Sequence, residues 1–136
     1  RLDKDTEGLI ILTNDGELSN LIMNPSRETK KDYYVILKNT INYDDIKQIE
    51  KGIEINIENL QYKTKPSKIK IIGEKELIIS ISEGKKRQIK KMFEAVGNKV
   101  VYLRRISIGS LKLGNLKTGE IKEVKREEIY DSLALQ

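Results

Sequence analysis

Hydrophobic residues recur along the chain with two spacings, and these spacings separate predicted helices from predicted strands. Between about Lys86 and Val96, apolar residues follow the i, i+3, i+4, i+7 pattern of one helix face, formed by Ile89, Met92, Phe93 and Val96. Gly97 comes next, and glycine is typical just beyond a helix end. This segment is the clearest predicted helix, and its other face is basic.

Three further helices are predicted. The first begins at Asn14, an N-cap residue with Glu17 at the third helical position, and ends near Asn24 because Pro25 disfavours helical dihedrals in the preceding residue. The second spans Asp44 to Lys51, with Gly52 as its C-cap. The third is a terminal helix from Glu127 to Leu135.

The segment Lys31–Leu37 is rich in β-branched and aromatic residues and is predicted to be a strand. Alternation places Tyr33, Val35 and Leu37 on one face. The opposite face is also partly apolar, which indicates a central strand. The other predicted strands are Leu9–Thr13, Ile53–Ile57, Tyr62–Ile72, Leu77–Ser82, Val100–Ile108, Leu111–Leu113 and Glu120–Val124.

The order of these elements predicts the fold class. Strands outnumber helices, and the connections are too short for regular βαβ crossovers. We therefore predict an α+β fold, with a mostly antiparallel mixed sheet flanked by a few helices.

Composition narrows the chemistry. The 136 residues contain no cysteine and no histidine, which excludes disulfides, thiol nucleophiles, imidazole bases and the usual zinc ligands. A net charge of +5 suits a polyanionic partner without requiring one. No apolar run approaches the ~18 residues of a membrane span, so we expect a cytoplasmic location and no membrane partner.

The opening segment, Arg1 to Leu9, places Asp3, Asp5 and Thr6 directly before an apolar stretch. By residue type alone, an ordinary polar turn is the commoner explanation. A fixed catalytic carboxylate is the functional alternative. A metal site built from Asp3 and Asp5 is another, although no third acidic ligand lies nearby in the sequence.

A second feature is basic: five of the seven residues from Lys85 to Lys91 carry positive charge where a strand leads into a helix. Cations at a helix amino terminus oppose the helix dipole, so their presence indicates binding of phosphates. A solvated helix face explains them about equally well. Arg104 and Arg105 add charge on a later strand.

Tyr33 and Tyr34 follow Lys30 and Lys31, and alternation sends the two rings to opposite faces of the strand. Packing is the commoner role for a tyrosine in a strand. An exposed ring beside lysines could instead stack on a nucleic-acid base, which contributes ~1–3 kcal/mol.

Together these segments resemble the RsuA/RluB-type pseudouridine synthases. That family's G-R-L-D-x-x-T-x-G-L signature is matched from Arg1 through Leu9, and its L-T-N-D-G-E-L run from Leu12 through Leu18. The K-x-Y motif appears at Lys31–Tyr33, and the E-G-[RK]-x-[RH]-Q-[VI]-[RK]-[RK]-M motif at Glu83–Met92. The resemblance covers nearly the whole chain.

The resemblance implies isomerisation of a uridine in ribosomal RNA to pseudouridine, with no metal or cofactor. It makes Asp3 the catalytic carboxylate, Tyr33 the ring that stacks on the target base and Lys85 the cation paired with Asp3. Large-subunit RNA is the preferred substrate and small-subunit RNA the second choice. The residues expected to contact RNA are Arg1, which could fill the gap left by the flipped base, Lys86, Arg87, Lys90, Lys91, Arg104 and Arg105.

The resemblance also implies that residues 1–136 are a catalytic domain without its first strand and without the S4-type RNA-binding domain that usually precedes it. Two rival hypotheses stay open. One is a non-catalytic RNA-binding module of the same fold. The other is a metal-dependent phosphoryl-transfer enzyme that uses Asp3 and Asp5.

Overall fold

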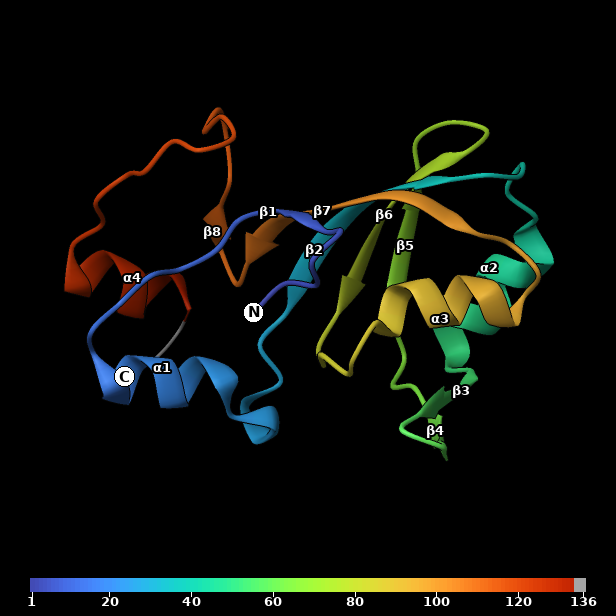
Figure 1. Ribbon diagram of the computed structural model, residues 1–136, viewed down its shortest axis with the longest axis horizontal. Helices are drawn as coiled ribbons and strands as arrows, with labels where there is room; N and C mark the ends of the chain where they lie inside the picture. The colour runs from blue at the N-terminus through green and yellow to red at the C-terminus, as the bar shows by residue number, and fades with distance from the viewer. Residues whose placement is uncertain (134–136) are drawn as a thin grey trace.

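The computed structural model of the protein describes residues 1–133 and has an α+β fold, as predicted. Its main sheet follows the order β1-β7-β2-β6-β5, with β8 paired to β7, and β3 and β4 form a separate hairpin (Figure 1). The strands are β1 (Glu7–Gly8), β2 (Lys31–Leu37), β3 (Glu54–Ile57), β4 (Leu60–Lys63), β5 (Lys68–Ile71), β6 (Glu76–Ile81), β7 (Val100–Ile108) and β8 (Leu111–Lys112). The helices are α1 (Gly16–Met23), a 3₁₀ turn (Pro25–Arg27), α2 (Tyr43–Lys51), α3 (Gln88–Ala95) and α4 (Arg126–Ser132).

Strand β2 is central, as its two-sided apolar pattern predicts. It pairs antiparallel with both β6 and β7, and the one parallel pairing within residues 1–133 joins β1 to β7. The predicted face of β2 is buried: Tyr33, Val35 and Leu37 are at most 9% exposed.

Helices α2 and α3 cover this face of the sheet, as Figure 1 shows. Ile89, Met92 and Phe93 of α3, predicted from helical periodicity, pack there against the central strands. A second cluster joins the opening segment to the helices α1 and α4, and it consists of Leu9, Leu18, Ile108, Ile129 and Leu133. Within residues 1–133, every helix is too short or too polar to cross a membrane.

The predicted strand Leu9–Thr13 is wrong. Pairing with β7 stops after Gly8, and beyond it Ile10 and Leu12 are 52% and 77% exposed. The cause lies at Leu9, whose carbonyl oxygen accepts hydrogen bonds from the side chain of Arg105 at 2.9 and 2.7 Å. Because a side chain takes the place of the next backbone donor, the ladder cannot continue.

Other boundaries also move. The predicted strand Tyr62–Ile72 divides into β4 and β5, because Pro66 has no N–H to donate and the residues around it bond elsewhere. Glu120–Val124 forms no strand. The N-cap of α1 is Asp15 rather than Asn14, and its carboxylate accepts the Leu18 N–H at 3.1 Å.

Two predicted helices are shorter than expected. Helix α3 begins at Gln88, two residues later than predicted, because Arg87 adopts a left-handed conformation with φ 54°. The terminal helix runs from Arg126 to Ser132, and the predicted end at Leu135 lies outside the described residues.

Gly8 is required where the opening segment joins the sheet. Its φ is 116°, and an added Cβ would overlap the backbone of Arg105. We expect Gly8→Ala to lower the free energy of unfolding by about 2 kcal/mol, through backbone strain and loss of the β1–β7 pairing. Urea denaturation measures this. The control is Gly16→Ala, where an added Cβ meets nothing within 4 Å. Equal stability of the two variants would contradict the proposed strain.

Candidate functional site

The opening segment folds into a tight turn that holds Asp3 near the sheet. The Thr6 N–H donates to the Asp3 carbonyl at 3.0 Å, which closes the turn. Directly afterwards, Glu7 and Gly8 pair with Arg104 and Arg105 of β7. A carboxylate three residues from the start of the chain is therefore anchored by backbone pairing.

The side chain of Lys90, in helix α3, contacts this turn and holds its polar side chains together. It lies in the first turn of α3 and is only 6% exposed. Its ammonium donates to Asp3 Oδ2 at 3.5 Å, to Asp5 Oδ1 at a shorter distance and to Thr6 Oγ1 at 3.1 Å. Three N–H groups thus meet three oxygen acceptors, which satisfies the buried cation. The ammonium bridges Asp3 and Asp5 and stabilises the negative charge of both.

The two carboxylates differ in exposure. The side chain of Asp5 is 59% exposed and also lies 3.6 Å from Arg87 Nη1. The hydrogen bond from Lys90 holds the pKa of Asp5 below its usual value. The side chain of Asp3 is 33% exposed, so it is partly enclosed and still accessible.

The predicted pairing of Asp3 with Lys85 is wrong. Lys85 precedes α3, and its ammonium lies 5.0 Å from the centre of the Tyr62 ring. Lys90 takes the place at Asp3 because it lies three residues before Phe93 and so borders the buried stripe of the helix. The same spacing relates Lys86 to Ile89, so the sequence by itself does not single out Lys90.

Arg105 connects the opening segment to β2. It is 5% exposed, and besides Leu9 its guanidinium also donates to the Arg1 carbonyl at 3.4 Å. In the sheet it pairs with Gly8 on one side and Tyr33 on the other. Two strand spacings, about 10 Å, therefore separate Gly8 from Tyr33.

Tyr33 belongs to the hydrophobic core and is 9% exposed. Its hydroxyl forms no hydrogen bond with any of residues 1–133. The ring therefore packs under the sheet, on the face covered by α3, and its phenol is available to a ligand. Its predicted stacking role stays a prediction.

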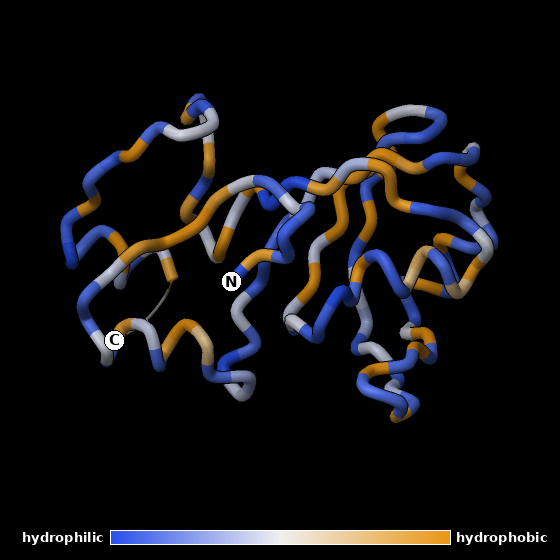
Figure 2. Tube along the Cα trace, in the orientation of Figure 1, coloured by the Kyte–Doolittle hydropathy of each residue, from blue (hydrophilic) through white to orange (hydrophobic). Residues whose placement is uncertain are grey.

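The residues predicted to contact RNA divide into three groups: exposed, buried and half-buried. Arg1, Lys86 and Arg87 are exposed, and the loop from β6 to α3 contains no strongly hydrophobic residue, its trace running from white to blue in Figure 2. The placement of Lys90 and Arg105 is corrected, because both are buried and use their donors inside the protein.

Lys91 and Arg104 also have internal contacts. The Lys91 ammonium donates to the Asn56 carbonyl at 2.7 Å. Arg104 lies over the rings of Tyr34 and Tyr102, at 5.2 and 5.9 Å from their centres, on the face of the sheet opposite Tyr33. Their predicted RNA contacts stay predictions.

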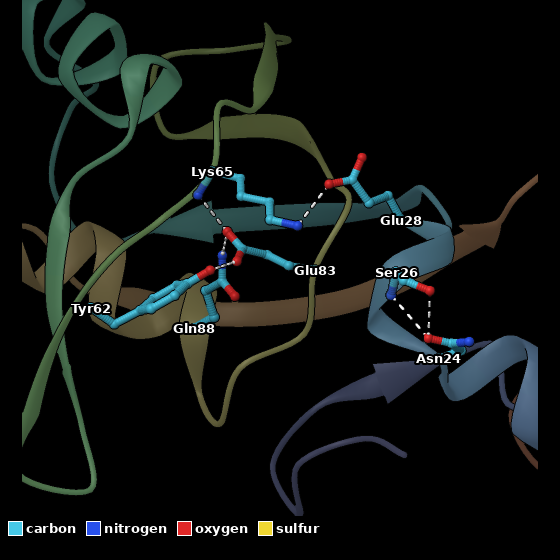
Figure 3. Close-up of polar contacts among 7 residues, drawn as sticks. All are labelled: Asn24, Ser26, Glu28, Tyr62, Lys65, Glu83 and Gln88. Carbon is cyan, nitrogen blue, oxygen red and sulfur yellow. Dashed lines mark hydrogen bonds and ion pairs between the residues drawn. The ribbon is translucent and has the colours of Figure 1, made fainter.

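Glu83 lies near the start of the loop between β6 and α3, and its hydrogen bonds hold that loop in place. Its carboxylate accepts the Lys65 N–H at 2.6 Å, the Gln88 amide at 2.9 Å and a short hydrogen bond from the Tyr62 hydroxyl (Figure 3). Gln88 in turn accepts the Lys85 N–H at 3.0 Å. The loop is thereby tied to α3 at one end and to the segment after β4 at the other.

A contact beside Glu83 extends this network. In Figure 3 the Lys65 ammonium points to Glu28, 2.7 Å away, which follows the 3₁₀ turn. The sequence motif contains Glu83, but only the structure reveals these partners, which are far apart in the chain.

The Tyr62–Glu83 hydrogen bond predicts a loss of stability in alkali. Bonding to the carboxylate raises the pKa of Tyr62 to about 12. Because this pKa exceeds the unfolded value of about 10, the contribution is complete below pH ~10 and is lost as the pH rises toward ~12. We expect Tyr62→Phe to weaken this dependence, measured by urea denaturation at several pH values. Tyr43→Phe, at a 71% exposed ring, is the control. Unchanged alkaline behaviour in Tyr62→Phe would contradict the assignment.

The metal-dependent rival hypothesis needs a third ligand beside Asp3 and Asp5. Within residues 1–133, no group of three acidic side chains could hold a metal ion. The ammonium of Lys90 already contacts both carboxylates. The arrangement thus matches a carboxylate held by a lysine more closely than a pair of metal ligands.

Comparison with known proteins finds a matching family model and relatives that are named pseudouridine synthases. Residues 1–95 match the family described as RNA pseudouridylate synthase. An uncharacterized RNA pseudouridine synthase from Bacillus subtilis, YtzG, is 44% identical and covers 96% of this chain and 55% of its own length. A crystal structure of a pseudouridylate synthase superposes with a TM-score of 0.88 at 36% identity, over 96% of this chain and 56% of that one.

Two further relatives bear on the RNA substrate. Proteins named ribosomal small subunit pseudouridine synthase A, from Vibrio cholerae and Escherichia coli, are 41% and 40% identical over 83% of this chain and 48% of their own. The chain thus spans about half the length of the curated relatives it matches. These names contradict the preference for large-subunit RNA predicted from the motifs.

Proposed function

The chain belongs to the RNA pseudouridylate synthase family, and on that premise we propose that it isomerises a uridine of ribosomal RNA to pseudouridine with Asp3 as the catalytic carboxylate. One observation carries the proposal. The Asp3 side chain is partly exposed and is held by a buried lysine in a turn anchored to the sheet. An ordinary polar turn does not require a buried cation.

The proposed isomerisation requires a carboxylate in a fixed position. In the reaction the N1–C1′ bond breaks, a C5–C1′ bond forms, and the proton from C5 is replaced by one at N1. A carboxylate with an ordinary pKa of ~3.9 is ionised at neutral pH and can attack the sugar or accept the proton. Lys90 supports that charge, because opposite charges ~4 Å apart attract by ~4 kcal/mol at an effective dielectric of ~20.

The target base must leave its stack to reach Asp3. Extruding a nucleotide costs a few kcal/mol, which stacking and phosphate contacts offset. Tyr33, whose hydroxyl has no hydrogen-bond partner in the described part of the chain, is the proposed ring beside the base. The exposed cations Lys85, Lys86 and Arg87 are the proposed contacts to the RNA backbone.

Small-subunit ribosomal RNA is the proposed substrate, because two named relatives act on the small subunit. We propose that the protein meets this RNA in the cytoplasm. The rival hypothesis, an RNA-binding module without catalysis, gives the cations the same role. The two hypotheses differ in that only the enzyme requires the carboxylate of Asp3.

The test is to map pseudouridines in ribosomal RNA from cells that lack the gene. We expect one site in small-subunit RNA to lose its pseudouridine and to regain it when the wild-type gene returns. A complete set of pseudouridines in the deletion strain would overturn the proposed function. Reintroducing Asp3→Asn instead separates the enzyme from the binding module, because only the enzyme requires that carboxylate.

A further inference from the structure

Lys31 is a half-buried cation that the chemistry at Asp3 does not use. It is the first residue of β2, and alternation places it on the same face as Tyr33. Its ammonium lies beside Gly84, because a Cβ added to that glycine would be 3.1 Å from Lys31 Nζ. Lys31 therefore lies between Tyr33 and the loop that leads to the basic helix.

The surroundings of Lys31 are short of negative charge. Burial and repulsion from Arg105 lower the pKa of Lys31, and attraction to Glu83 opposes them only in part. Arg105 donates to carbonyl oxygens and, within the described residues, has no carboxylate partner. Lys31 and Arg105 are thus two cations that lie near each other and are partly shielded from solvent.

Neither nearby carboxylate forms an ion pair with Lys31 within residues 1–133. The oxygens of Glu83 accept from the Tyr62 hydroxyl, the Lys65 backbone N–H and the Gln88 amide, so this carboxylate is held away from Lys31 and acts on it only at longer range. Asp3 is paired with Lys90. Within residues 1–133, the ammonium of Lys31 forms no hydrogen bond or ion pair. A partly buried cation without a partner costs free energy unless an anion from outside binds it.

We propose that Lys31 binds a backbone phosphate of the RNA substrate, beside the nucleotide that enters the site. This inference rests on the proposed function and adds a contact to it. A phosphodiester fits because an ammonium binds phosphate as a point charge, and because Gly84, with no side chain, leaves the ammonium accessible. The contact would fix the RNA backbone at the beginning of β2, beside the loop that contains Gly84.

The test compares Lys31→Met with Lys31→Arg and a matched control. Lys31→Met keeps the length of the stem and removes the charge. Lys38→Met is the control, because Lys38 is exposed just beyond the other end of the same strand. Each change is made in the full protein carrying Asp3→Asn, and binding to unmodified small-subunit ribosomal RNA, transcribed in vitro, is measured across salt concentrations.

We expect Lys31→Met to weaken binding about tenfold and to reduce the slope of log affinity against log salt by roughly 0.7 to 0.9, the value for one phosphate contact. Lys31→Arg should retain most of the slope, and Lys38→Met should keep all of it. The melting temperature of Lys31→Met should stay equal or rise, because an unpaired cation beside Arg105 is removed.

Two results separate the possible failures. A lower melting temperature with an unchanged salt slope in Lys31→Met would make Lys31 a structural residue and overturn the inference. Failure of the protein with Asp3 intact to form pseudouridine in this RNA would overturn the proposed function. The salt slope would still test the phosphate contact, because binding does not depend on catalysis.

Discussion

Asp3→Asn is expected to abolish pseudouridine formation, with a loss of at least about a thousandfold in the single-turnover rate. Asparagine keeps the size of the side chain and an oxygen that can accept from Lys90. It removes the negative charge that attacks the sugar or accepts the proton. Release of tritium from RNA labelled at C5 of uridine measures the rate.

Binding should survive the same change. We expect the affinity of Asp3→Asn for RNA to stay within about threefold of wild type, because phosphate contacts by lysines and arginines supply most of the affinity. The control is Asp5→Asn. Asp5 contacts the same Lys90 ammonium as Asp3, but its side chain is 59% exposed. If both variants kept their activity, or lost it equally, the special role of Asp3 would be refuted.

Lys90→Met is expected to have the second-largest effect, lowering the rate about a hundredfold and the melting temperature by roughly 5 °C. Methionine fills the space but leaves Asp3, Asp5 and Thr6 without their common donor. The two carboxylates then repel each other, and the turn loses its fixed position. Thermal unfolding measures the change in melting temperature, and the tritium assay measures the change in rate.

Lys86→Met is the matched control for Lys90→Met. Lys86 is exposed two residues before the helix, so its loss removes the same charge without disturbing the turn. We expect it to weaken RNA binding slightly and to leave stability unchanged. Equal melting temperatures for Lys90→Met and wild type would show that the buried ammonium does not hold the turn.

Much of the fold follows from local patterns. The bounds of Val100–Ile108 and Lys31–Leu37 agree between prediction and structure, since long alternating or apolar segments have few other ways to bury their side chains. Helix α3 was predicted for the same reason. Leu9–Thr13 was not predictable in this way, because a side chain of β7, distant in sequence, ends the ladder there.

The candidate site also has features that follow from neighbouring residues and features that depend on contacts distant in the sequence. Residue types identified the basic segment, and the family motif selected Asp3, because both features are contiguous in the chain; the catalytic role of Asp3 stays a prediction. The partner of Asp3 was misassigned to Lys85, since that choice depends on where α3 begins and which way its first turn faces. Lys31 was noticed as a neighbour of the tyrosines and as the lysine of the K-x-Y motif, without a role of its own. Its lack of a partner within residues 1–133 became visible when the structure placed Arg105 and Gly84 beside it.

The sequence alone determined the α+β class, the buried face of the central strand and the carboxylate on which the proposed reaction depends, because periodicity and motif are properties of neighbouring residues. Only the tertiary structure decided which of the five cations from Lys85 to Lys91 meets Asp3 and is buried. It also decided that Lys31 lies near Arg105 and forms no ion pair within residues 1–133. Those outcomes depend on distances between segments up to 87 residues apart, and such distances are set by packing.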